Sequence, residues 1–281
     1  HGYHLLIGYS LNDSAREKSL LEDCRARLVD GVVILLGDTD SPRTWLEETS
    51  REGYPVVSLD PPAVHTPNFS TDYVLGGAIA ARYLLELGHR KIAVVANAGE
   101  ETSLPISLRM NSFLGETRRA GVIPAIIPYH TTNSFPVSAP RSEEALVIAG
   151  LKTGKKIFSR RDRPTALFAS NDEIGLGLVK AALEAGIAIP DELSVIGFDD
   201  SPAAAFAPVP LTTIRQPVGE IGRLAVETLL DMIRNEPVRD RRTKRHPHVL
   251  VPPELMIRAS TGPAPGTTLA RFPRRGTRTT R

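Results

Sequence analysis

Short apolar runs alternate with segments of helical period along most of the chain, and this alternation constrains the fold more than any other feature. Strands that are apolar on both faces belong in parallel sheets whose two faces are covered by helices. Helices also supply the long connections that parallel strands need. The apolar runs predict seven strands, at 3–10, 31–37, 54–60, 91–97, 165–170, 193–199 and 211–216.

Apolar residues at helical spacing occupy several of the intervening segments. They predict helices over 14–28, 76–88, 172–186 and 218–234. Gly88 suits the C-terminal end of the second of these, and Asn171 or Asp172 suits the N-cap of the third. The repeated units are too many for one short sheet, so the chain is an α/β protein. Two doubly wound lobes and an eight-fold barrel both remain open at this point.

Three segments interrupt the alternation. Residues 129–142 are rich in Thr, Ser and Pro, which predicts a loop, and residues 239–248 form a basic connector. Residues 263–281 carry arginines, no acids and little to bury, so we expect a disordered basic tail.

Composition excludes several classes of protein. A formal net charge of +2 is too small to indicate a nucleic-acid or membrane partner, and no apolar run approaches the length of a transmembrane helix. A single cysteine, Cys24, excludes an internal disulfide and suits a reducing cytoplasm. The sequence opens at His1 without Met or a secretory leader, and we expect a truncated N-terminus.

The common catalytic signatures are absent from the sequence. It contains neither G-x-G-x-x-G nor G-x-S-x-G, and the glycines of GLKTGKK (150–156) are too closely spaced for a phosphate loop. The histidines are scattered and lack the spacing of metal ligands. We therefore expect no enzymatic activity, no cofactor and no metal.

Polar residues at the ends of apolar strands are the remaining candidates for a site. In open α/β sheets, ligands bind at the carboxyl ends of the strands. Asn171 and Asp172 follow one strand, where they also suit a helix cap, and Asp199 and Asp200 follow another. A capping or turn role accounts well for one of the two adjacent aspartates, but it accounts poorly for the presence of both. Arg109 lies near the start of a helix, against the dipole, and either faces solvent or points at a ligand.

Six blocks of the sequence, taken in order, resemble the effector-binding domain of the LacI/GalR family of bacterial transcription regulators. They are VDGVVIL (29–35), PVVSLD (55–60) and the segments 70–95, 107–113, 163–200 and 210–233. The resemblance implies two Rossmann-like lobes with parallel sheets, joined by three crossovers as in periplasmic binding proteins, and it removes the barrel. The implied N-terminal lobe is 1–88 with 217–245, and the C-terminal lobe is 89–216 with 246–262. The first strand and helix of the family's first lobe are missing.

The resemblance also implies a function and a site. A small sugar or sugar-like effector, with a purine-like one as the other class, would bind between the lobes of a cytoplasmic repressor. By position, the effector contacts are Arg109, Asn171 and Asp199, with Asp72 and Tyr73 from the first lobe. We expect a homodimer with no membrane partner, and operator DNA bound only through a helix-turn-helix absent from this sequence. The alternative is the solute-binding protein of a sugar transporter.

Overall fold

The computed structural model describes residues 2–10, 13–26, 29–35, 45–46, 48–49, 52–59, 66–97, 103–130, 143–234 and 247–267. Its helices are α1 (Ser14–Ala26), α3 (Tyr73–Glu86), α4 (Leu104–Arg119), α5 (Glu143–Phe158), α6 (Asp172–Glu184), α7 (Pro202–Phe206) and α8 (Val218–Arg234). Its strands are β1 (Val32–Leu35), β2 (Val56–Leu59), β3 (Asn68–Thr71), β4 (Ile92–Asn97), β5 (Ala125–Tyr129), β6 (Ala166–Ala169), β7 (Ser194–Ile196), β8 (Thr213–Arg215), β9 (His248–Val251) and β10 (Glu254–Met256).

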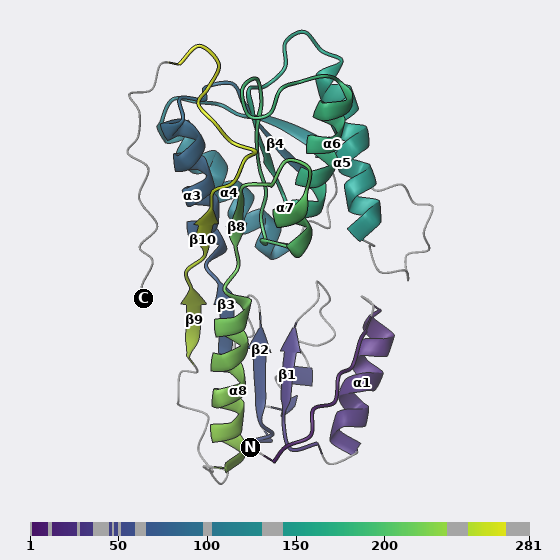
Figure 1. The fold of residues 1–281 in the computed structure, drawn as a ribbon. Coiled ribbons are helices and arrows are strands. Elements are labelled where there is room, and N and C mark those ends of the chain that lie inside the picture. Colours follow the sequence, from purple (N-terminus) through teal and green to yellow (C-terminus); the bar gives the residue numbers. More distant parts are fainter. Residues whose placement is uncertain are drawn as a thin grey trace, which may run out of the picture.

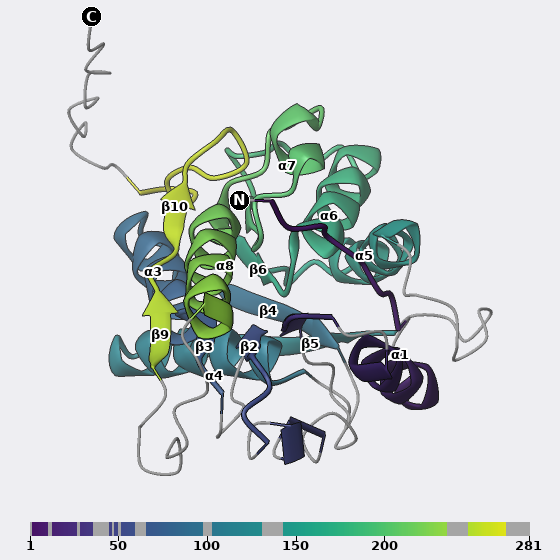
Figure 2. The ribbon, with the colours of Figure 1, turned by 90° about the horizontal axis from the view of Figure 1, so that it is seen from below.

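The first sheet is parallel, has the order β1-β2-β3-β9, and forms the lower half of the molecule in Figure 1. Successive residues of β2 point to opposite faces, as in any strand. Val56 packs in a cluster with Leu21 of α1, whereas Val57 packs in another with Ile221 of α8. Seen from below, α8 lies over β2 and β3, away from α1 (Figure 2). The sheet is therefore covered on both faces.

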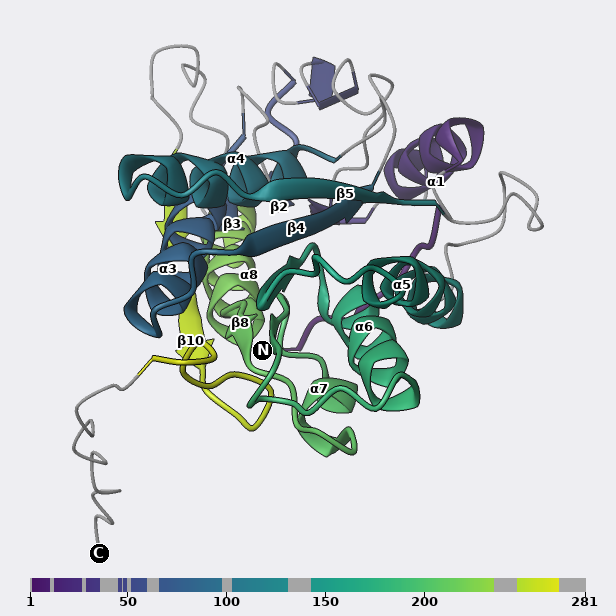
Figure 3. The same ribbon diagram turned by 90° about the horizontal axis from the view of Figure 1, so that it is seen from above.

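The second sheet is also parallel and has the order β5-β4-β6-β7. Figure 3 shows α3 and α4 on one face and α5 and α6 on the other. Along β4, Ile92 and Val94 join the cluster under α3 and α4, and Ala93 and Val95 join the cluster under α5 and α6. Because helices cover both faces of this sheet, its central strands are apolar on both faces. The strands predicted at 91–97 and 165–170 have this pattern.

Helices α5 and α6 approach each other closely because glycines face each other across their contact. A Cβ at Gly150 would lie 2.4 Å from the carbonyl oxygen of Ile174, and one at Gly177 would lie 2.2 Å from that of Val147. The spacing leaves room for no side chain at either position. Helix α5 is not among the helices predicted from the apolar spacing.

The chain crosses between the two sheets three times, between β3 and α3, between β8 and α8, and between β9 and β10. This architecture confirms the predicted two-sheet fold with three crossovers. Strand β8 extends the second sheet beyond β7 through the bridge from Ile196 to Thr212, and it pairs antiparallel with β10. The second sheet thus carries an antiparallel addition that the sequence analysis does not predict.

Two segments lie in a different layer from the one expected. Helix α3, expected with residues 1–88 in the first lobe, packs its buried face against α4 and the second sheet through Ala80, Ala81 and Leu84. Strand β9, expected with 246–262 in the second lobe, pairs with β3 and so belongs to the first sheet. In both cases the packing partner determines the layer to which the segment belongs, because a helix or strand joins the layer that buries its apolar face.

Two further expectations are corrected at the ends of the described chain. Residues 3–10 form no strand, because no described strand pairs with them, and their large side chains are exposed: Tyr3, Leu5, Leu6, Ile7 and Tyr9. The disorder predicted from residue 263 onward is wrong for Ala264, which is buried and whose N–H donates to the carbonyl of Leu87. Residues 131–142, 235–246 and 268–281, which hold most of the predicted loop, connector and tail, lie outside the described residues. None of the helices in the described ranges has the length and apolar character needed to cross a membrane.

Candidate functional site

Arg109 and Asp199 meet at the carboxyl ends of the second sheet. Arg109 of α4 is only 5% exposed, which excludes the solvent-facing alternative. Its Nη1 donates to Oδ1 of Asp199 at 3.3 Å, and its guanidinium lies 4.3 Å from the centroid of the Phe198 ring. A buried cation needs a paired charge and gains from an aromatic face. The structure supplies both.

The turn that carries Asp199 has an unusual backbone conformation. The backbone φ angle is +112° at Asp199 and +59° at Asp200, values that residues other than glycine rarely adopt. The N–H of Asp199 donates to the carbonyl of Ile214 at 2.8 Å, and that of Asp200 donates to Oγ1 of Thr213 at 3.4 Å. Strained conformations of this kind persist where surrounding contacts hold them, and they concentrate at functional sites.

The two adjacent aspartates have different partners. Asp200 accepts hydrogen bonds from Nε of Arg215, at 2.6 Å, and from Nη2 of Arg258. Burial by itself would raise the pKa of the Asp200 carboxyl, but the bonds from these two arginines hold it below its ordinary value. Asp200 therefore braces the turn, and the carboxylate of Asp199 is the one that meets Arg109.

Gln216 joins this group, although the sequence analysis does not single it out. Its Nε2 donates to Oδ1 of Asp199 at 2.6 Å, while its Oε1 accepts from Oγ1 of Thr71 at 2.9 Å and from the hydroxyl of Tyr73 at 3.1 Å. Tyr73 is buried, with its ring 6.0 Å from the guanidinium carbon of Arg109. The rule that places polar residues at strand ends would have found Gln216, because it follows β8 directly.

The other two predicted contact residues cap helices. Oδ1 of Asn171 accepts from the N–H of Ile174 at 3.1 Å at the start of α6, which confirms the predicted N-cap. Asn171 follows β6, the neighbour of β7, and so lies at the same edge of the sheet as Asp199. Oδ1 of Asp72 accepts from the N–H of Leu75 at 2.8 Å at the start of α3.

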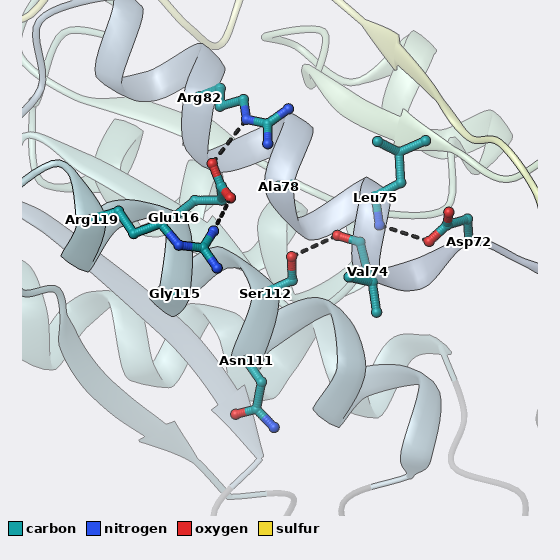
Figure 4. Close-up of a pocket in the computed structure, with 10 residues that line it drawn as sticks. All are labelled: Asp72, Val74, Leu75, Ala78, Arg82, Asn111, Ser112, Gly115, Glu116 and Arg119. Carbon is teal, nitrogen blue, oxygen red and sulfur yellow. Dashed lines mark hydrogen bonds and ion pairs between the residues drawn. The ribbon is translucent and has the colours of Figure 1, made fainter.

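Asp72 also lines a groove between α3 and α4, on the surface of the molecule (Figure 4). At one end of this groove, Arg82 and Arg119 both pair with the carboxylate of Glu116, as the dashed lines in the figure show. Neither Arg109 nor Asp199 lines the groove. The pair at the strand ends and the groove are therefore separate features.

Asp172 lies directly behind the turn and is fully buried. Its Oδ2 accepts from the N–H of Ser201 at 2.7 Å, and its Oδ1 accepts from Oγ1 of Thr213 at 2.6 Å. Burial raises the pKa of this carboxyl to about 7, and the charges of Asp199 and Glu173 add to the effect, while the two hydrogen bonds oppose it.

Several polar atoms at this edge are buried without a hydrogen-bond partner: Nε of Arg109, Oγ of Ser170 and Oγ of Ser201. Such atoms are rare in native proteins and call for an explanation. Together with Asp199 and Gln216, they offer both donors and acceptors next to an aromatic face. Convergent donors and acceptors of this kind are what small-molecule sites use to orient a ligand. In the described part of the chain, no group of three or more His, Cys, Asp or Glu residues could hold a metal ion.

The sequence matches a family model described as a periplasmic binding protein-like domain over residues 81–261. It is 32% identical over 271 residues to the HTH-type transcriptional regulator DegA of Bacillus subtilis. The alignment covers 93% of this chain and 73% of DegA. It is 29% identical over 250 residues to the ribose operon repressor of Escherichia coli (88% and 71% covered). It is 31% identical over 253 residues to the repressor PurR of Klebsiella pneumoniae (89% and 70% covered).

Solved structures resemble the whole fold. A LacI family transcriptional regulator from Enterococcus faecalis with bound ribose superposes with a TM-score of 0.72 at 27% identity, covering 92% of this chain and 88% of that one. Another from Lactobacillus casei with bound glucose gives a TM-score of 0.71 at 25% identity, covering 93% and 89%.

Proposed function

Since the chain belongs to the LacI family of transcriptional regulators, with its periplasmic binding protein-like domain, we propose that it is the effector-sensing domain of a repressor. The effector is a small sugar or sugar-like molecule that binds between the two sheets, at Arg109, Asp199 and Gln216. A purine is the other class of effector within the proposal, because one similar protein is PurR.

One observation carries the proposal, namely the group formed by Arg109, Asp199 and Gln216 at the ends of β7 and β8. Arg109 donates, Asp199 accepts, and the carboxamide of Gln216 does both. Sugar hydroxyls donate and accept in the same way, and the buried rings of Phe198 and Tyr73 pack against Arg109. Asn171 and Asp72 lie at helix starts beside strand ends and remain proposed contacts.

The same group supports a mechanism of signalling. Gln216 contacts Thr71, the last residue of a strand of the first sheet, and Asp199, in a turn of the second sheet. A ligand that takes hydrogen bonds from this group competes with contacts that join the two layers. It thereby binds one arrangement of the layers more tightly than another and shifts the population between them. DNA affinity and ligand affinity are then coupled reciprocally.

The remaining parts of the proposal concern partners and location. The relatives named above are transcriptional regulators, which favours this function over the solute-binding protein of a transporter. We propose that the regulator acts as a homodimer in the cytoplasm and contacts operator DNA through a helix-turn-helix. Residues 1–281 on their own are expected to give no sequence-specific shift of an operator fragment.

Calorimetric titration with D-ribose, D-glucose, sucrose, hypoxanthine and guanine tests the proposed function. We expect one of these to bind the parent chain, and Asp199→Ala and Arg109→Met to abolish the binding. Glu227→Gln, which removes an exposed carboxylate of α8, serves as a control and should leave the affinity unchanged. If no compound of the panel binds, the ligand class is wrong, and if Asp199→Ala binds as tightly as the parent, the site is wrong.

A further inference from the structure

The geometry points to Asp172 as a positioning residue that holds the turn 197–201 so that the carboxylate of Asp199 faces Arg109. The effect of Asp172 on ligand affinity rests on the proposed function, whereas its effect on the conformation of the turn does not. Asp172 itself is fully buried and acts through the turn.

Asp199 needs to be held because its φ of +112° is strained for a residue with a side chain. Rotation to a negative φ would relieve the strain and carry the carboxylate away from Arg109 and Gln216. The stability of this backbone conformation therefore depends on the hydrogen bonds of the surrounding backbone.

Asp172 controls two of these bonds. It accepts the N–H of Ser201 directly, at 2.7 Å, and it fixes the hydroxyl of Thr213, at 2.6 Å, which in turn accepts the N–H of Asp200. It also packs against the start of the turn, since a Cβ at Gly197 would lie 2.3 Å from its Oδ1. The carboxylate thus contacts the turn at its beginning and at its end.

The charge of Asp172 decides how strongly it holds the turn, because hydrogen bonds to an ionised acceptor are roughly twice as strong as neutral ones. The charged groups that act on it are Asp199, from the turn, and Glu173, from its own helix. Ser201 and Thr213 are uncharged, and the nearby Arg215 of β8 pairs with Asp200. Burial raises the pKa of Asp172 to about 7, so both of its forms exist near neutral pH.

Asparagine at position 172 imitates the protonated acid. Its oxygen accepts from Ser201, and its amide donates to the hydroxyl of Thr213, so the contacts persist without the charge. Asp172→Asn is therefore a conservative variant that isolates the charge. Glu173→Gln is a matched control, since it removes a carboxylate from the same turn of α6 and leaves both bonds of Asp172 in place.

Backbone amide NMR between pH 5 and 9 tests the proposal without a ligand. In the parent chain we expect the amides of Ser201 and Asp199 to shift with one shared midpoint near 7. In Asp172→Asn both should stay near their acid positions at every pH, and in Glu173→Gln the shared titration should persist. An Asp199 amide that does not titrate with that of Ser201 in the parent would overturn the proposal, whether or not the variant folds.

Titration with D-ribose, bound in a similar solved structure, adds the functional readout. We expect the parent to bind about tenfold more tightly at pH 8 than at pH 5.5, and Asp172→Asn to match the weaker affinity at both. Equal affinity of the parent and the variant at pH 8 would refute the link to binding. If ribose binds neither, the failure falls on the proposed sugar, and the amide titration still decides the role of Asp172.

Discussion

Gly77 of α3 lies against the backbone of Arg109, so the Gly77→Ala substitution tests how tightly the site depends on the contact between α3 and α4. A Cβ at Gly77 would lie 2.0 Å from the carbonyl oxygen of Arg109, whereas real Cβ contacts are essentially never shorter than 3.0 Å. The neighbour is backbone and cannot rotate away. The two helices must therefore move apart by roughly 1 Å, against native packing density.

Overpacking of a core typically costs about 1–3 kcal/mol, and alanine in place of glycine in a helix returns about 1 kcal/mol. We expect Gly77→Ala to lower the free energy of unfolding by up to about 2 kcal/mol, which corresponds to a melting temperature lower by up to roughly 8 °C. Differential scanning calorimetry measures the shift. Because Arg109 moves with α4, ligand affinity should fall as well.

Gly115 of α4 provides the matched control. A Cβ there would meet nothing within 4 Å, so Gly115→Ala should stabilise the chain by up to about 1 kcal/mol through helix propensity alone. If Gly77→Ala were as stable as Gly115→Ala, the close contact between α3 and α4 would not exist as described, and the reasoning would fail.

Three further predictions concern buried polar groups. Arg109→Met keeps the contact with Phe198 but removes the charge, so the melting temperature should change little while ligand binding is lost in calorimetry. Burial lowers the pKa of His89 below its ordinary 6.5. The unfolded chain therefore binds a proton that the folded chain excludes, and stability falls as the pH drops below 6.5. The urea midpoint of His89→Gln should lack this fall between pH 7 and 5. Asp200→Asn should lose about 1–3 kcal/mol of stability at pH 7, because its bonds from Arg215 and Arg258 lose the charge. The difference from the parent should begin to shrink as the pH falls below the ordinary aspartate pKa of 3.8, and it should vanish only below the lowered pKa of Asp200 in the folded chain.

The apolar runs predicted β4, β6 and β7 because these strands are buried on both faces by helices. Strand β3 escaped prediction since its buried side chains are mostly polar: Asn68, Ser70 and Thr71. Asn68 donates to Oγ of Ser58 at 3.0 Å. A hydropathy pattern does not detect such polar pairing between neighbouring strands. Residues 3–10 show the reverse error, because an apolar run forms a strand only where a neighbour pairs with it.

The site divides in a similar way. The rule of strand ends predicted Asp199, and the family resemblance added Arg109, whose direction the periodicity left open. The same rule marks Asp172 and would have found Gln216, but the partners of these two side chains come from segments far apart in the sequence. Gln216 bonds to Thr71 across 145 positions, and Asp172 bonds to Ser201 across 29. Only a folded chain reveals such contacts.

Mapping a bound ligand by amide chemical shifts tests the central claim most directly. When a sugar or purine that binds the parent chain is added, the largest shifts should fall on Arg109, Asp199 and Gln216 and on their immediate neighbours. The groove between α3 and α4 around Gly115 and Glu116 should show little change. Shifts concentrated in that groove, with the amides of Asp199 and Gln216 unmoved, would contradict the account.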